Sequence, residues 1–219
     1  MARVFTDISI SLDGFAAGPS PSLEDPLGVG GMQLHEWAFR LAAWRKPHGL
    51  EGGEVGPESE VIDRNRAATA AVVMGRRMFS SGDGPWADDP NANGWWGDEP
   101  PFHTPVFVVT HHAREPLEML GGTTFTFVTD GVAAAVEQAR AAAGGKDVQV
   151  SGGANVVQQA LALGLLDELQ VHIAPVVLGA GTPLFASGAP GRFEIVETIP
   201  STYATYVRYR ITASTSPAS

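Results

Sequence analysis

The feature that most constrains the fold is a regular alternation of short apolar runs and helical segments between residues 106 and 173. The runs VFVVT (106–110) and TTFTFVT (123–129) are rich in β-branched and aromatic residues, which is typical of strands. VAAAVEQARAAA (132–143) has the helical period, and the glycine pair that follows ends a helix well. The strand VQVSG, the helix VVQQALALG and the strand ELQVHIAPVVLG complete the series. This alternation predicts a sheet that is mostly parallel in its middle, with helices on both faces.

The flanking segments extend this pattern at both ends. Arg3–Leu12 alternates as a first strand, and the apolar spacing of Gln33–Arg45 predicts an amphipathic helix. Ser59 is placed to cap a further helix that leads to the buried strand AAVVMG (70–75). The segment FEIVETIPSTYATYVRYRI (193–211) reads as two antiparallel strands. We therefore expect an α/β fold with about eight strands and four helices. Residues 80–104, with many Gly and Pro breaks, are either a lid or a packed loop.

Composition limits the class of protein. With 219 residues, 44% of them apolar, we expect a single domain over residues 1–212 and a flexible tail at 213–219. No run approaches the roughly 18 apolar residues of a membrane span, and the start of the sequence lacks a signal-peptide core, so we expect a cytoplasmic protein. Zero cysteines remove disulfides and thiolate chemistry. Acidic residues outnumber Lys and Arg by 24 to 14, which disfavours nucleic acid and anionic membranes as partners.

Two of the predicted strands end in polar or cationic residues. In VVMGRRMF, Gly75 allows a turn, and Arg76 and Arg77 then stand at a helix start, where cations oppose the helix dipole unless an anion is bound. Solvated surface arginines are the alternative. In VFVVTHH, Thr110 and His111 offer hydrogen bonds at a second strand end. Adjacent histidines on an extended segment point to opposite faces, so we expect no metal site there.

The third strand end is VSGGANVV, where a strand meets a helix across Gly152–Gly153. Glycines at this position let a ligand approach the backbone closely, and the helix that follows offers free N–H groups to a pyrophosphate. A simple tight turn remains the alternative, because the pattern G-x-G-x-x-G is missing. Ligands of open α/β sheets gather at the carboxyl ends of parallel strands. One extended phosphorylated dinucleotide would account for all three strand ends together.

The order and spacing of several segments resemble a known family. ISLDGFAAGP, VMGRRMF, VFVVTHH, FVTDG, VSGGANVV and DELQVHIAPVVLGAGTPLF follow the pattern of the dihydrofolate reductase-like fold. Within that fold, they resemble the branch related to the C-terminal reductase domain of the bifunctional riboflavin-biosynthesis protein. The resemblance covers nearly the whole chain. It implies a three-layer α/β/α fold with an eight-stranded mixed sheet, mostly parallel, that ends in an antiparallel hairpin. It also implies NADPH as cofactor, a small-molecule substrate and a homodimer.

The resemblance assigns cofactor contacts by matched position. It places the two arginines near the 2′-phosphate, the second strand end at the adenosine, and the glycine pair, whose peptide is often cis in this family, at the pyrophosphate. Three residues near the start of the chain would line the nicotinamide side. The implied contacts are Ser9, Ile10, Ala17, Gly75, Arg76, Arg77, Met78, Thr110, His111, Ser151, Gly152, Gly153, Ala154, Asn155 and Val156.

The resemblance assigns the residues that would contact the substrate less clearly than those that would contact the cofactor. True dihydrofolate reductases carry an acidic residue on the first long helix, and Glu36 is the nearest candidate in LHEWAFRLAAW. With Asp13 and His35, it forms our set of candidate proton donors, each of which has a turn or surface role as its alternative. Flat apolar side chains would suit an aromatic heterocycle, although core packing explains any one of them equally well. The candidates for that pocket are Trp37, Trp86, Trp96 and Phe102.

These observations lead to one main hypothesis and two rivals. The main hypothesis is an NADPH-dependent reductase that transfers a hydride to a small heterocycle, either as a 5-amino-6-(5-phosphoribosylamino)uracil reductase-like enzyme or as a pteridine or dihydrofolate reductase-like one. The first rival is an NADPH-binding sensor or regulatory protein without turnover. The second is a scaffold in which the strand-end residues have only structural roles.

Overall fold

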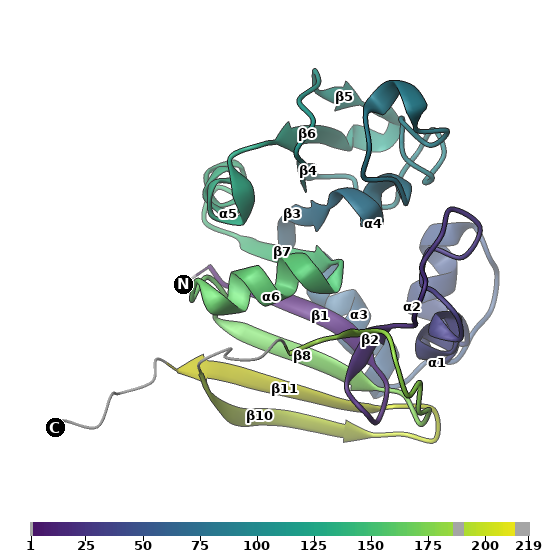
Figure 1. Ribbon diagram of the computed structural model, residues 1–219. Helices are drawn as coiled ribbons and strands as arrows, with labels where there is room; N and C mark the ends of the chain where they lie inside the picture. Colours follow the sequence, from purple (N-terminus) through teal and green to yellow (C-terminus); the bar gives the residue numbers. More distant parts are fainter. Residues whose placement is uncertain (1, 186–190, 213–219) are drawn as a thin grey trace, which may run out of the picture.

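A nine-stranded mixed sheet runs through the molecule, in the order β10-β11-β8-β1-β7-β3-β4-β6-β5 (Figure 1). The computed structural model describes residues 2–185 and 191–212, so the predicted tail at 213–219 lies outside the described residues. The six strands from β8 to β6 are parallel, and β11, β10 and β5 are antiparallel to their neighbours. The strands are β1 (Val4–Ile10), β3 (Thr69–Gly75), β4 (Pro105–Val109), β5 (Leu117–Glu118), β6 (Thr124–Val128), β7 (Asp147–Gly152), β8 (Glu168–Ile173), β10 (Arg192–Pro200) and β11 (Thr205–Thr212).

Helices cover both faces of this sheet, as the sequence predicts. In Figure 1, α6 lies in front of the sheet and α3 lies behind it. A small second sheet joins β2 (Phe15–Ala17) to β9 (Thr182–Pro183). No helix among residues 2–185 and 191–212 is long and apolar enough to cross a membrane. The helices are η1 (Gly31–His35), α1 (Glu36–Phe39), α2 (Ala42–Arg45), η2 (Lys46–His48), α3 (Pro57–Ala68), α4 (Arg76–Ser80), η3 (Trp86–Asp88), η4 (Leu120–Gly122), α5 (Gly131–Ala142) and α6 (Ala154–Ala162).

The face under α5 and α6 is mostly apolar across the parallel strands. Small and β-branched side chains of the strands, such as Val73 and Val150, pack against alanines and valines of both helices. The sequence predicts this directly, because parallel strands that are buried on both faces are typically rich in Val and Ile. Alanine on the helices allows close packing on the sheet, and Ala135, Ala139 and Ala160 are fully buried there.

The opposite face divides into an aromatic part and a polar part. Under α4, Phe79 packs edge-on against Phe125 and Phe127 of β6, and Trp86 and Trp96 extend this cluster. Residues 80–104 therefore include aromatic side chains that pack on the sheet, which favours the packed-loop interpretation over a lid. Towards β1 and β8, the side chains beneath α3 are polar instead.

Three expectations about the elements need correction. The large sheet has nine strands rather than eight, because the two-residue β5 pairs with β6. The helix predicted over Gln33–Arg45 is interrupted at Leu41, which is extended because the N–H of Ala42 donates to the carbonyl of Glu54. Ser59 does not cap α3, which begins at Pro57. Ser59 is the third residue of α3, and its hydroxyl accepts a hydrogen bond from the N–H of Ala43 on α2.

Candidate functional site

The carboxyl ends of β3 and β7 meet at the start of α6. Gly152 has φ of +130°, a conformation that favours glycine, and the peptide that joins it to Gly153 is cis. A Cβ atom added at Gly75 would lie 3.0 Å from Val156 Cγ2 and 3.5 Å from the backbone nitrogen of Gly153. Gly75 therefore allows the end of β3 to lie close against the first turn of α6. Met78 lies on the other side of Gly152, with its sulfur 3.5 Å from the position of an added Cβ.

Gly153 differs from its neighbour in a way that matters for ligand binding. It is exposed, its φ is −66°, and a Cβ atom added to it would meet no atom within 4 Å. The first N–H groups of an α-helix have no partner within that helix, and α6 begins at Ala154 directly after this residue. Together, these features leave an open approach to backbone donors at the edge of the sheet.

The second predicted strand end lies on the next strand of the sheet. Thr110 follows β4 and is buried, and its N–H donates to the carbonyl of Val128. Its hydroxyl accepts a hydrogen bond from the N–H of His112, whereas His111 is exposed. In the described residues, no group of three or more His, Cys, Asp or Glu side chains is placed to hold a metal ion.

The two predicted arginines have different environments. Arg76 is only 6% exposed, and its Nη2 lies 2.5 Å from Asp89 Oδ2. Its guanidinium carbon is 3.5 Å from the ring centre of Trp86, and Arg114 approaches the same ring at 4.7 Å. The alternative of a solvated surface arginine is therefore wrong for Arg76, because the side chain is buried. The resemblance places Arg76 near the 2′-phosphate, whereas here its guanidinium contacts Asp89 and Trp86. Arg114 is a cation near this strand end that the sequence analysis missed.

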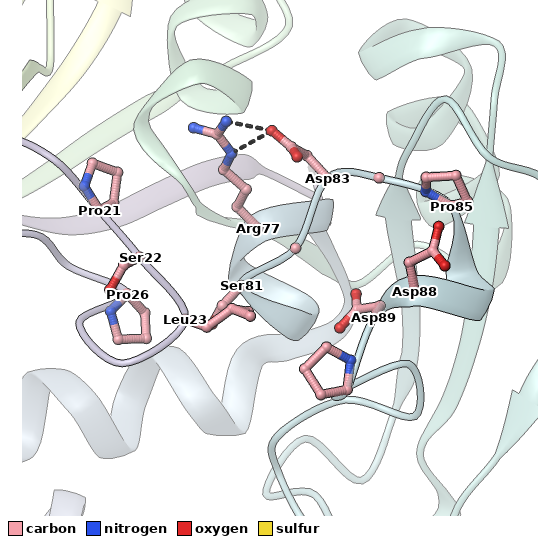
Figure 2. A pocket seen from close by; sticks show the side chains of 13 residues that line it. Pro21, Ser22, Leu23, Pro26, Arg77, Ser81, Asp83, Pro85, Asp88 and Asp89 are labelled. Carbon is pink, nitrogen blue, oxygen red and sulfur yellow. Dashed lines mark hydrogen bonds and ion pairs between the residues drawn. The ribbon is translucent and has the colours of Figure 1, made fainter.

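Arg77 lies at the surface, in a pocket of about 320 Å³. Figure 2 shows its guanidinium paired with the carboxylate of Asp83, and both side chains are about two-thirds exposed. The hydrogen bond and charge of Arg77 lower the pKa of Asp83. The loop that carries Pro21 and Pro26 forms the other wall of the pocket. Of the two arginines, Arg77 is the one that a solvent-borne anion could reach without disturbing the core.

Residues predicted on the nicotinamide side lie at the carboxyl end of β1 and on β2. Ser9 is buried, and its hydroxyl accepts a hydrogen bond of 3.0 Å from Trp37 Nε1. Ile10, the last residue of β1, is buried against the α5 and α6 face. Ala17 ends the short strand β2 and is partly exposed. Ser151 and Asn155 lie beside the glycine pair, where Asn155 is exposed.

The three candidate proton donors have unequal surroundings. Asp13 accepts hydrogen bonds from the N–H groups of Leu178 and Gly179, so it anchors a loop. A hydrogen bond from Ser11 contributes most to lowering the pKa of Asp13, which is unfavourable for a donor near neutral pH. Glu36 is exposed at the start of α1. Burial lowers the pKa of His35, and the charge of His172 lowers it further.

The four aromatic residues predicted to line one pocket lie in two separate clusters. Trp86, Trp96 and Phe102 pack with Phe79 on the β4 and β6 side of the sheet. Trp37 packs instead with α2 and the β10–β11 connection, and its ring stacks on His172 at 3.9 Å. Core packing therefore accounts for the first three, and Trp37 alone lies beside the end of β1.

Several polar residues near Trp37 were missed by the sequence analysis. Asp7, Asn65, Gln170, His172 and Tyr206 form a connected group beneath α3, in which only Asp7 is partly exposed. One signal could have found them: in FTDISIS and ELQVHI, polar residues recur at every second position of strands that the topology buries. A polar row on a central strand covered by helices calls for partners, because buried polar groups are normally hydrogen-bonded.

Comparisons with known proteins fit this architecture. A model of the RibD C-terminal domain family matches residues 2–202, and the chain belongs to this family. The uncharacterized protein YyaP of Bacillus subtilis (strain 168) is 51% identical over 41 residues, which are 19% of this chain and only 22% of that protein.

Solved structures show the same fold at low sequence identity. A putative riboflavin biosynthesis protein from Shewanella sp. PV-4 superposes with a TM-score of 0.61 at 20% identity, over 96% of this chain and 99% of that one. A diaminohydroxyphosphoribosylaminopyrimidine deaminase/5-amino-6-(5-phosphoribosylamino)uracil reductase from Thermotoga maritima gives 0.54 at 15%, over 96% and 57%. Dihydrofolate reductase from Enterococcus faecalis, complexed with NADP(H), gives 0.51 at 13%, over 95% and 96%. The predicted dihydrofolate reductase-like fold is confirmed.

The buried pair of Arg76 and Asp89 generates a prediction about stability. Burial raises the pKa of Asp89, but hydrogen bonds from Ser80 and Asn91 and the charge of Arg76 together hold it below its usual value. Its contribution to stability is therefore complete above about pH 4 and is lost as pH falls through the folded-state pKa. Asp89→Asn should cost about 3–5 kcal/mol at neutral pH, because it leaves a buried cation without its partner.

Urea unfolding between about pH 7 and pH 3 measures both effects. Asp89→Asn should also flatten the acid dependence relative to the unmodified chain. Asp88→Asn, at an exposed neighbouring position, is the matched control and should change stability by about 0.5 kcal/mol or less. Equal effects of the two substitutions would contradict the assigned role of the pair.

Proposed function

We propose that this chain is an NADPH-dependent reductase that transfers a hydride to a small heterocyclic substrate. The observation that carries the proposal is the open Gly153 corner, where a strand end and the first turn of α6 present backbone donors at the carboxyl edge of the sheet. Membership of the RibD C-terminal domain family supports a reductase, and a fold neighbour that was solved with NADP(H) supports the cofactor.

The order of the strands determines the orientation in which this cofactor would bind. β7 lies between β3 and β1, so the Gly152–Gly153 corner is flanked by the end of β3 on one side and the end of β1 on the other. A dinucleotide with its pyrophosphate at the corner would extend its adenosine half towards β3 and β4. Its nicotinamide half would extend towards Ser9 on β1. In this pose, Arg77 supplies positive charge on the β3 side, and Thr110 and His111 border the adenosine.

For the substrate, two chemical types fit the family and the fold. One is a phosphoribosyl-aminopyrimidine, the substrate type in the name of the Thermotoga maritima protein, and the other is a pteridine such as dihydrofolate. Hydride transfer needs a dry, flat pocket next to the nicotinamide ring and a source for one proton. Trp37 is a flat side chain at the end of β1, where its indole N–H donates to Ser9.

The direct test has two stages that separate binding from turnover. Calorimetric titration should show binding of NADPH at submillimolar concentration, and a screen of pyrimidines, pteridines and quinones should find a compound that oxidises bound NADPH. Binding without oxidation of any compound would favour the sensor without turnover. Absence of binding would refute the proposal.

The glycine corner gives a sharper prediction. Gly153→Ala should lower NADPH affinity about tenfold or more, because the added methyl occupies the space through which the pyrophosphate approaches, and tenfold corresponds to about 1.4 kcal/mol. Stability should change little, because the methyl meets no atom within 4 Å and φ is ordinary. The matched control is Gly191→Ala, at the residue before β10, where the methyl makes only ordinary contacts with Phe193 and Ile211. Lost stability with unchanged affinity per folded molecule would show that Gly153 is only a turn residue.

Cofactor choice should depend on Arg77. Arg77→Gln should weaken NADPH roughly ten- to hundredfold and NADH little, because it removes a charge-assisted bond worth about 1.5–3 kcal/mol. Asp83→Asn should strengthen NADPH, since Asp83 competes for the same guanidinium. Arg210→Gln, in an exposed pair on the distant hairpin, is the control. Equal losses for NADPH and NADH would refute the role of Arg77 at the 2′-phosphate.

A further inference from the structure

The buried polar group beneath α3 is centred on a carboxylate and an imidazole. His172 on β8 is 2% exposed, and its Nε2 lies 2.7 Å from Asp7 Oδ1 on β1. The other oxygen of Asp7 accepts a hydrogen bond of 2.8 Å from Asn65 Nδ2 on α3. A largely buried carboxylate is costly without partners, and the amide of Asn65 and the imidazole of His172 are the groups placed beside its two oxygens.

Both ring nitrogens of His172 are buried without a hydrogen bond of good geometry among the described residues. Nε2 still has the carboxylate of Asp7 beside it, whereas no ion-pair partner among those residues lies beside Nδ1. Nδ1 of His35, on η1, is likewise buried without a hydrogen bond to a described residue. Burial lowers the pKa of His35, and the positive charge of His172 lowers it further. Because buried polar groups are normally hydrogen-bonded, His172 Nδ1 is placed to take a polar partner that is supplied from outside the chain.

The position of this pair within the sheet connects it with the proposed cofactor site. Ser9 and His172 are direct register partners on β1 and β8, one residue before both strands end. β7 is the other neighbour of β1, and the Gly152–Gly153 corner ends β7. Since neighbouring strands lie about 4.8 Å apart, His172 and the corner are about 10 Å apart across the same edge. A nicotinamide that reaches Ser9 would lie beside His172.

Surrounding groups hold the imidazole in one orientation. Trp37 stacks on it with an interplanar angle of 14°, and Tyr206 of β11 lies on another side with its ring centre at 5.1 Å. Tyr206 donates its hydroxyl to Gln170, and burial together with the charge of Asp7 raises its pKa. The titratable side chains that face His172 from the packed elements are thus Asp7, His35 and a neutral Tyr206. Farther out, Glu197 is paired with Arg64 and Arg208.

We propose that the Asp7–His172 pair holds the proton that accompanies hydride transfer. This inference rests on the proposed reductase function. Bound NADPH would supply a hydride to the carbon of a substrate C=N bond and would leave as NADP⁺. The π electrons of that bond would move to nitrogen, which would take the proton from Nδ1 of His172. His172, then neutral and still held by Asp7, would regain a proton from solvent.

The test is a histidine-selective NMR titration, which follows six side chains and needs no substrate. His172→Gln assigns the resonance. In Asp7→Asn, the titration midpoint of His172 should fall by about 1–3 pH units, because a negative neighbour is removed without a change of shape. Glu168→Gln, on the same face of β8 but paired with Arg3, is the matched control and should leave the midpoint unchanged.

Nucleotide complexes then test the place of His172 in the reaction. With NADP⁺, the cationic nicotinamide should lower the midpoint of His172 by about 1 pH unit relative to the NADPH complex. The midpoints of His48 and His103 should stay the same. Equal midpoints of His172 in both complexes, or an unchanged midpoint in Asp7→Asn, would show that the pair has only a structural role. The proposed reductase function would not be affected by that result. If neither nucleotide binds, the reductase proposal fails and this inference fails with it.

Discussion

The close approach of β3 to the first turn of α6 is the constraint on which the rest of the site depends. Gly75 leaves room for Val156 and for the backbone of Gly153, so strand ends that are distant in the sequence meet at one edge. The same approach leaves Gly153 exposed with open space above it. One glycine thus allows close packing and the other has open space around it, and the proposed cofactor site lies where the two meet.

The two faces of the sheet were not equally predictable. The apolar face under α5 and α6 follows from residue type and period, because alanines and valines on helices and strands specify the same packing. The break at Leu41 could not be predicted in that way, since it depends on a backbone hydrogen bond from Ala42 to Glu54. The helical period of the side chains contains no information about such a long-range partner.

The site shows the same division between local and long-range information. The turns at Gly75 and Gly152–Gly153 could be predicted from local turn chemistry together with the resemblance, while the cofactor contacts assigned to them and to Arg77 stay predictions. The environment of Arg76 could not be predicted, because its partners Asp89 and Trp86 reach it only when residues 80–104 fold back on the sheet. Asp7 and His172 were missed for a related reason: they are 165 residues apart in sequence, and only the pairing of β1 with β8 brings them together.

The central claim is that a nicotinamide dinucleotide lies across the carboxyl edge formed by β3, β7 and β1. A crystal structure of the chain with NADPH tests it most directly. The account predicts the pyrophosphate against the backbone of residues 152–156, the 2′-phosphate within reach of Arg77, and the nicotinamide ring beside Ser9 and Trp37. A nucleotide bound elsewhere on the molecule, or a Gly153 corner that stays empty at saturating NADPH, would contradict it.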